Sequence, residues 1–181
     1  MWCAEELLFA SCRQHNVDLL HEAFSHLTSP DAIGEFINVS LDPLGNTALH
    51  VASARGSLEC LDVLLDQEGV EVDPRNRMDG DTPLHCAAKL SQEEGYEEEA
   101  KETIEMLLEA GADPRYIFPF LIYRGTNGDR IRNKGKLKAI DIVPSQQTEL
   151  KGILKRAELK YLYATDVVQG VSLSLSDAYC R

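Results

Sequence analysis

Histidine is the side chain in this sequence best suited to bind a metal or to transfer protons near neutral pH. Three of the five histidines lie near the N-terminus, at His15, His21 and His26. His21 and His26 are five residues apart, and this spacing does not place two side chains on one face of a helix, as a metal site there requires. The other two, His50 and His85, lie within two copies of one phrase. We therefore predict no metal-binding histidines.

The remaining reactive side chains do not form a recognisable catalytic pattern. The sequence has no phosphate-binding loop, no dinucleotide-binding glycine motif and no His-Glu-x-x-His motif. Carboxylates are too abundant for any pair of them to indicate acid–base catalysis. The cysteines lack Cys-x-x-Cys spacing and suit small apolar side chains in a reducing compartment. They are Cys3, Cys12, Cys60, Cys86 and Cys180. We expect a non-enzymatic protein with no cofactor and no metal, located in the cytoplasm, the nucleus or both.

The positions of His50 and His85 follow from an internal repeat. Residues 45–52 read Gly-Asn-Thr-Ala-Leu-His-Val-Ala, and residues 80–87, which begin 35 residues further on, read Gly-Asp-Thr-Pro-Leu-His-Cys-Ala. Self-similarity with a period between about 20 and 50 residues is typical of stacked-repeat proteins. Because the two histidines hold the same place in consecutive repeats, we predict that both are buried packing residues.

Each copy carries the signals of a turn followed by two helices. Gly45 and Gly80 follow short polar stretches, where glycine can adopt a positive φ angle. Thr47 and Thr82 then stand where a hydroxyl can cap the first turn of a helix. Gly56 ends the first short helix, and apolar residues at helical spacing predict a second one. These apolar residues are Leu58, Leu61, Leu64 and Leu65 in one copy and Ile104, Leu107 and Leu108 in the next.

The second copy resembles the ankyrin repeat. The resemblance rests on Thr82-Pro83-Leu84-His85 followed by Ala87-Ala88, and on the segment Glu109-Ala110-Gly111-Ala112-Asp113. It implies an all-α fold, an ankyrin-repeat solenoid of stacked helix pairs with β-turn fingers that project from one edge. It also implies that Thr47 and Thr82 bond to His50 and His85, which would then tie neighbouring repeats together.

The resemblance divides residues 1–160 into about four repeats. The repeats cover about 3–40, 41–75, 76–115 and 131–160, with insertions at 91–98 and 116–130 and a disordered tail at 161–181. The first repeat lacks the turn and the threonine, as terminal repeats often do. In the last repeat, Lys138 and Asp141 replace the threonine and the histidine. The phrases Ala139–Val143 and Thr148–Leu150 are similar to short free-standing fungal ankyrin proteins.

Two insertions distinguish this chain from a regular ankyrin array. Without them, Thr82 and Lys138 are 33 residues apart, which is the ankyrin period. Segment 91–98 is acidic, contains one tyrosine and lies between paired helices; it is either a solvated extension or a docking spur. Segment 116–130 is either an apolar recognition loop or a short intron retained in the gene. The intron alternative arises because the codons at the ends of segment 116–130 and within it can contain sequences that resemble splice signals.

Charge is distributed unevenly along the chain, whose net charge is −12. Residues 1–114 contain 6 Lys and Arg against 24 Asp and Glu, whereas residues 115–160 contain 11 against 4. The acidic repeats either serve solubility or attract a basic partner. Basic residues at 130–138 lack interleaved aromatics, and the net charge disfavours binding to a nucleic-acid duplex, so no nucleic acid is expected. The longest apolar run, 116–123, is too short to span a bilayer, so no membrane is expected.

These observations predict a non-catalytic protein–protein interaction module, an adaptor or scaffold with no small-molecule substrate. One alternative is an escort for a basic client, such as a ribosomal or proteasomal subunit, and another is a regulatory inhibitor of an enzyme. The ankyrin resemblance implies that the protein partner binds to the fingers and to the first helix of each pair. The candidate positions are Pro43, Leu44, Asn46, Ala54, Arg55, Met78, Asp79, Asp81, Lys89 and Leu90.

Overall fold

Helices form all of the regular structure in the described part of the computed structural model. The structure describes residues 3–25, 27, 29–115 and 138–168. In chain order the helices of this part are α1 (Ala4–Gln14), α2 (Val17–Phe24), α3 (Pro30–Val39), α4 (Ala48–Arg55), α5 (Leu58–Leu65), α6 (Pro83–Leu90), α7 (Glu97–Glu109), α8 (Ala139–Ile142) and α9 (Thr148–Val168). The predicted all-α class is confirmed for these residues.

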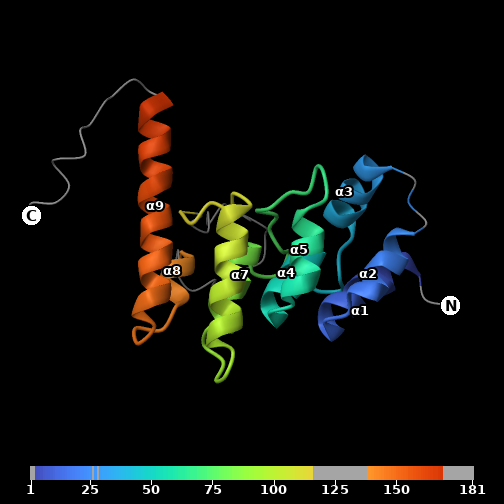
Figure 1. The fold of residues 1–181 in the computed structure, drawn as a ribbon, viewed down its shortest axis with the longest axis horizontal. Helices are drawn as coiled ribbons and strands as arrows, with labels where there is room; N and C mark the ends of the chain where they lie inside the picture. The colour runs from blue at the N-terminus through green and yellow to red at the C-terminus, as the bar shows by residue number, and fades with distance from the viewer. Residues whose placement is uncertain (1–2, 26, 28, 116–137, 169–181) are drawn as a thin grey trace, which may run out of the picture.

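The helices stack along one axis, from α1 and α2 at one end to α8 and α9 at the other (Figure 1). Helices α1, α4, α6 and α8 contact one another in chain order and form the inner layer, and α2, α5, α7 and α9 form the outer layer. Each inner helix packs on the outer helix that is its partner in the repeat. Contacts are more extensive within the inner layer, so the inner helices lie closer together than the outer ones. This arrangement is the predicted solenoid of helix pairs.

The different spacing of the two layers follows from side-chain size. The inner helices α4 and α6 are rich in fully buried alanine, which lets two backbones approach closely. The outer helices instead bury large side chains, which fill the space between repeats. Leu61 and Leu64 of α5 and Ile104 and Leu107 of α7 are each 0% exposed. Their burial confirms the apolar face that the helical spacing predicts.

Helix α3 was not predicted from the sequence. It begins after Ser29, whose hydroxyl accepts the N–H of Ala32, and it packs against the chain that follows α5. An ideal Cβ on Gly34 would lie 2.1 Å from the carbonyl oxygen of Glu68, so only glycine fits at this contact. Asn38 then donates to the carbonyl of Gly69 at 2.8 Å. Helix α3 therefore joins the first repeat to the end of the second.

The insertion at 91–98 is divided between a loop and a helix. Residues 91–96 connect α6 to α7, and α7 begins at Glu97. The expectation that Glu97 and Glu98 belong to the linker is therefore wrong. The residues 97–99 are all glutamates, and carboxylates in the first turn of a helix interact favourably with its dipole. The insertion thus lengthens α7 as well as the loop.

The C-terminal boundary also differs from the expectation. Helix α9 continues to Val168, so residues 161–168 are helical rather than part of a disordered tail. The first residues of this stretch are anchored, because the hydroxyl of Tyr161 donates to the carbonyl of Gly111. The insertion at 116–130 and the rest of the predicted tail, 169–181, lie outside the described residues.

Candidate partner-binding surface

The first finger, residues 42–46, is held by the side chain of Asp42. Its Oδ1 atom accepts the backbone N–H of Leu44 at 2.8 Å and of Asn46 at 2.9 Å. The backbone N–H of Asp42 donates to the carbonyl of Asn46 at 2.9 Å and closes the loop. An aspartate that bonds the backbone two residues further on is a known turn former. Burial alone would raise the pKa of Asp42, but these hydrogen bonds and nearby Arg13 outweigh burial and lower it.

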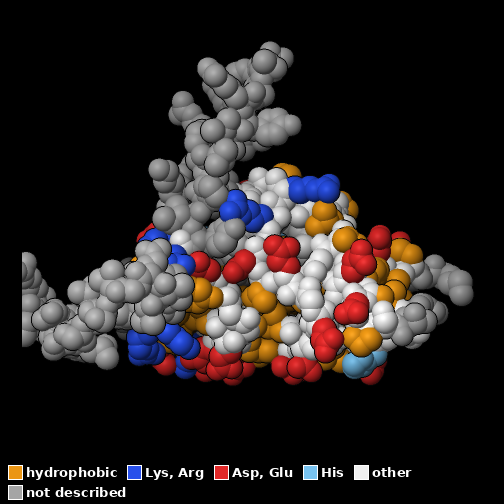
Figure 2. Space-filling model, turned by 90° about the horizontal axis from the view of Figure 1, so that it is seen from above, with side chains coloured by type: hydrophobic (Ala, Val, Ile, Leu, Met, Phe, Trp, Pro, Cys, Tyr) orange, Lys and Arg blue, Asp and Glu red, His pale blue; other side chains and the backbone are white. Residues whose placement is uncertain are grey.

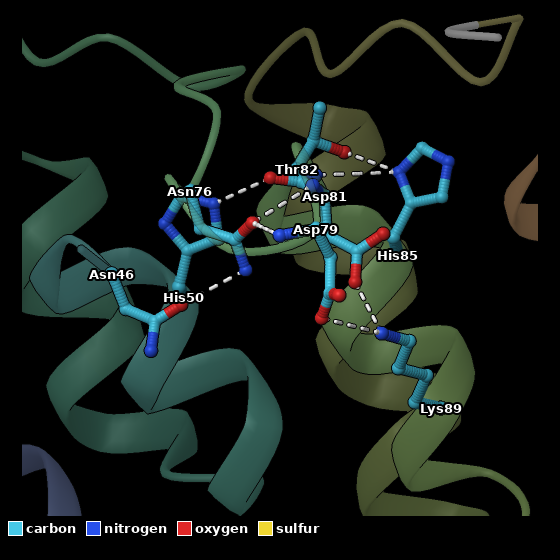
Figure 3. Close-up of polar contacts among 8 residues, drawn as sticks. All are labelled: Asn46, His50, Asn76, Asp79, Asp81, Thr82, His85 and Lys89. Atoms are coloured by element: carbon cyan, nitrogen blue, oxygen red, sulfur yellow. Dashed lines mark hydrogen bonds and ion pairs between the residues drawn. The ribbon is translucent and has the colours of Figure 1, made fainter. Parts of the chain in front are cut away.

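The second finger, residues 76–81, repeats this design with asparagine in place of aspartate. The Oδ1 atom of Asn76 accepts the backbone N–H groups of Asp79 and Asp81, both at 3.0 Å (Figure 3). The backbone N–H of Asn76 donates to the carbonyl of Asp81 at 2.9 Å. Neither Asp42 nor Asn76 was predicted to have this role. The signal was present, because each is a turn-forming side chain shortly before the glycine of the repeat phrase.

The two fingers are joined directly to each other. The side chain of Asn76 donates to Oδ1 of Asn46 at 3.0 Å, and the backbone N–H of Arg77 donates to the carbonyl of Gly45 at 3.2 Å. Gly45 has a φ of 77°, and an ideal Cβ there would lie 2.5 Å from the Cβ of Arg77. The absence of a side chain at Gly45 therefore makes room for the aliphatic stem of Arg77. Hydrogen bonds and side-chain packing therefore connect the two finger tips.

His50 connects the second repeat to the third from inside. Its Nδ1 accepts the backbone N–H of Thr47 at 3.2 Å and lies 2.9 Å from the threonine hydroxyl. Because a backbone N–H can only donate, the proton of the neutral ring is on Nε2, which donates to the carbonyl of Asp81 at 2.8 Å. The ring is 1% exposed, and burial lowers its pKa. The expected threonine bond and the tie between repeats are both confirmed.

His85 makes the same threonine contacts in the third repeat, and the fourth repeat uses a substitute. Nδ1 of His85 lies 2.8 Å from the hydroxyl of Thr82, and the ring is 2% exposed. The predicted burial of both repeat histidines is confirmed. In the fourth repeat a carboxylate oxygen of Asp141 accepts the backbone N–H of Lys138 at 3.0 Å. Asp141 therefore caps its own helix as the histidines do. Its shorter side chain makes only this contact within the repeat, and not the contact to a neighbouring repeat that His50 makes.

Eight of the ten candidate residues are accessible. Leu44 and Met78, at the finger tips, are 57% and 62% exposed. The other accessible residues are Pro43, Asn46, Ala54, Arg55, Asp79 and Lys89, of which Asn46 is half-buried. Asp81 and Leu90 are only 4% exposed, so including them in a contact surface was wrong. Asp81 turns toward Lys89, and the side chain of Leu90 packs over Gly56 of the preceding repeat.

Lys89 lies close to both acidic groups of the second finger. The ammonium of Lys89 bonds to the buried carboxylate of Asp81 and lies 3.7 Å from that of Asp79 (Figure 3). Burial alone would lower the pKa of Lys89, but the bonds to Asp81 and Asp79 outweigh burial and raise it. Lys89 thus stays charged at physiological pH. Its single positive charge offsets half of the negative charge of the two finger aspartates.

Charge is segregated between the two layers. Helices α4 and α6 of the inner layer contain no Asp or Glu, and their basic residues are Arg55 and Lys89. Helices α5 and α7 of the outer layer contain eight Asp and Glu residues and one basic residue, Lys101. Figure 2 shows acidic side chains along the centre and lower edge of the molecule and basic side chains at its upper edge and lower left. The surface charge of these repeats therefore depends strongly on the side from which a partner approaches.

The described residues contain no group of three or more His, Cys, Asp and Glu side chains that could hold a metal ion. The same residues include no helix long and apolar enough to cross a membrane. Burial raises the pKa of Cys12 and Cys86 to about 12 and that of Cys60 to about 11. These thiols are protonated at neutral pH and act as packing groups.

Comparison with known proteins agrees with this architecture. The family profile described as ankyrin repeats, in three copies, matches residues 7–117. This chain is an ankyrin repeat protein. It is similar to the ankyrin repeat-containing protein YGL242C of Saccharomyces cerevisiae, with 42% identity over 159 residues that cover 86% of this chain and 78% of the relative.

Two further matches cover smaller parts of their proteins. The ANK repeat-containing protein nipk-1 of Caenorhabditis elegans is 30% identical over 114 residues, which cover 61% of this chain and 18% of that protein. The zinc finger CCCH domain-containing protein 24 of Oryza sativa is 43% identical over 67 residues, which cover 37% of this chain and 8% of that protein. Ankyrin repeats indicate a protein–protein interaction module, and the family is generally non-catalytic.

Proposed function

We propose that this ankyrin protein is an adaptor that binds one partner protein through its finger surface. The finger surface consists of the eight accessible candidates, Pro43, Leu44, Asn46, Ala54, Arg55, Met78, Asp79 and Lys89. The observation that carries the proposal is the exposure of two large apolar side chains, Leu44 and Met78, on fingers locked by hydrogen bonds. Rigid presentation of apolar groups lowers the entropic cost of binding. We further propose a cytoplasmic or nuclear location, which suits the free thiols.

A pair of matched double variants tests the adaptor proposal. The variant Leu44→Asp/Met78→Asp places charge on both finger tips. The control Leu159→Asp/Leu162→Asp makes the same change on α9, where the two leucines are 45% and 47% exposed. Each protein is used as bait in cells, and the captured proteins are quantified by mass spectrometry. We expect the partner to be lost from the finger variant and kept by the control. If both variants captured the partner equally well, the adaptor proposal would be wrong.

An escort function for a basic client is a second candidate, and the charge of the outer layer favours it. The acidic residues of α5 and α7 would attract such a client to the outer helices rather than to the fingers. Glu102→Gln/Glu109→Gln changes two exposed carboxylates of α7 and should weaken capture of a basic client. Raising the salt concentration from about 0.1 to 1 M should release it, because screening shortens the Debye length from about 10 to 3 Å. A captured protein that is insensitive to both changes would exclude the escort function.

A further inference from the structure

The net charge of the chain suggests a basic partner, but the charges on the finger surface suggest a different chemistry. Asp42 is buried, accepts backbone hydrogen bonds and lies 3.8 Å from the guanidinium of Arg13. Asp81 is buried and paired with Lys89, whose ammonium also lies 3.7 Å from the carboxylate of Asp79. The finger carboxylates thus have cationic partners within the protein. They offer little to attract lysine or arginine side chains from outside.

Two cations of this region have no such compensation. Arg55, at the end of α4, and Arg77, in the second finger, are both exposed. Neither forms an ion pair with a carboxylate of the described residues. Among the described charged groups named here, four cations (Arg13, Arg55, Arg77 and Lys89) stand against three carboxylates (Asp42, Asp79 and Asp81), so their net charge is positive.

Arg77 also adjoins the two segments that carry the apolar finger tips. It directly precedes Met78 in the chain, and its stem lies over Gly45, the neighbour of Leu44. Its side chain therefore starts next to the residues on either finger that expose apolar groups. Apolar neighbours lower the local dielectric and strengthen a charge-assisted hydrogen bond to a carboxylate.

We propose that the finger surface takes an extended acidic segment of the partner protein, with carboxylates on Arg77 and Arg55 and apolar side chains on Leu44 and Met78. This inference rests on the proposed function, since it names the chemistry of the segment that the adaptor binds. A bidentate guanidinium–carboxylate pair supplies orientation as well as affinity. The inner helices α4 and α6 contribute no carboxylate that would repel such a segment.

The test is a selection from a display library of random linear peptides against the full chain. Peptides enriched by the wild-type protein should carry more Asp and Glu than the unselected library, together with Leu, Ile, Val or Phe. Arg77→Gln should bind the enriched peptides about tenfold more weakly, which is the loss expected for one charge-assisted pair. Arg77→Lys should recover part of the binding. Arg156→Gln, an exposed position on α9, is the matched control and should bind like the wild type.

Arg55→Gln gives a second measurement that does not disturb the finger contacts. It should also weaken binding of the acidic peptides, even if Arg77→Gln lowers the thermal stability of the protein. Enrichment of basic or neutral peptides, failure to enrich any peptide, or unchanged binding by both arginine variants would each overturn the inference.

The same selection separates this inference from the adaptor proposal. Neutral or basic peptides that no longer bind Leu44→Asp/Met78→Asp would overturn the acidic chemistry and leave the finger surface as the binding site. Peptides that bind this double variant as well as they bind the wild type would overturn both.

Discussion

The joint between the second and third repeats and the joint between the third and fourth are built from different contacts. At the first joint, His50 donates from a buried ring to the backbone of Asp81, and the side chain of buried Asn76 donates to Asn46 at 3.0 Å. At the second joint, the side chain of Gln92, which is exposed, donates to the carbonyl of Ile142 at 2.7 Å, and that of Gln147 donates to the carbonyl of Ser91 at 2.6 Å. An ion pair between Lys101 and Glu149 at 2.9 Å and the bond from Tyr161 to Gly111 connect α9 to the third repeat as well.

The difference lies in the length and exposure of the connecting side chains. Short or ring side chains that are already buried lose little further freedom when they bond. Long exposed side chains must be ordered, and water competes for their bonds. We infer that the first joint is the more strongly coupled of the two. Each repeat of a solenoid is stabilised mainly by its neighbours, so the fourth repeat should be the more independent unit.

The largest expected loss of stability comes from truncating a buried leucine, and it should be the same at both joints. Leu64 of α5 and Leu154 of α9 are both 0% exposed. Replacing either with alanine should lower the free energy of unfolding by about 2–5 kcal/mol, the usual range for a truncated core leucine. Urea denaturation followed by circular dichroism measures this change. A loss below about 1 kcal/mol at either site would mean that the apolar core, and not only the polar contacts, differs between the joints.

A larger difference between the joints is expected from their capping residues. His50→Ala removes bonds on both sides of the ring and leaves the N–H of Thr47 and the carbonyl of Asp81 buried, so we expect a loss of about 2–4 kcal/mol. Asp141→Ala removes one exposed capping bond and should cost about 0.5–2 kcal/mol. Equal losses in denaturant titrations would contradict the proposed difference in coupling.

Two glycines provide the next comparison. Gly45 has a positive φ and no room for a Cβ, so Gly45→Ala should destabilise the protein by about 1–3 kcal/mol. Gly152, within α9, has nothing within 4 Å of an ideal Cβ, so Gly152→Ala should stabilise by about 0.5–1 kcal/mol. Thermal melts should show a lower melting temperature for Gly45→Ala and a higher one for Gly152→Ala than for the wild type. If Gly45→Ala instead raised the melting temperature, the contact between the two fingers would not contribute to stability.

The smallest effect is a pH dependence specific to the first joint. Burial holds the pKa of His50 below its usual 6.5, so the folded protein keeps the ring neutral when the unfolded chain begins to take up a proton. The contribution of His50 to stability is therefore full above pH 6.5 and is lost as the pH falls from there toward the folded pKa. His50→Gln should show a shallower decline in unfolding free energy than the wild type over this interval. Parallel declines would mean that the ring is protonated inside the folded joint.

Local signals allowed much of the fold to be predicted. The caps at Thr47 and Thr82 and the helix end at Gly56 depend on residues close in sequence, and all are found where the repeat phrase predicts them. The buried histidines were also predictable, because a repeat period converts one local pattern into a statement about neighbouring units. Helix α3 was missed although its start has a local signal, the cap at Ser29 followed by Pro30. What the local sequence does not contain is its packing, because the contact of Gly34 with Glu68 joins distant parts of the chain.

The candidate surface was predicted only in part, for the same reason. Leu44 and Met78 are exposed, as expected of residues at the tip of a turn. Asp81 and Leu90 were expected at the surface, but contacts outside their own local segment bury them. The carbonyl of Asp81 meets His50, and Leu90 packs over Gly56 of the preceding repeat. A single repeat examined by itself does not contain these contacts.

The sequence by itself determined the helical repeat, its period, its capping residues and its net charge of −12. Only the tertiary structure decided which charges lie together. The net charge does not say where on the surface the individual charges lie. Folding placed the carboxylates of α5 and α7 on the outer layer, paired Asp81 with Lys89, and left Arg77 exposed beside Met78. A partner meets the local arrangement at contact distance, because solvent ions screen charges that lie further away.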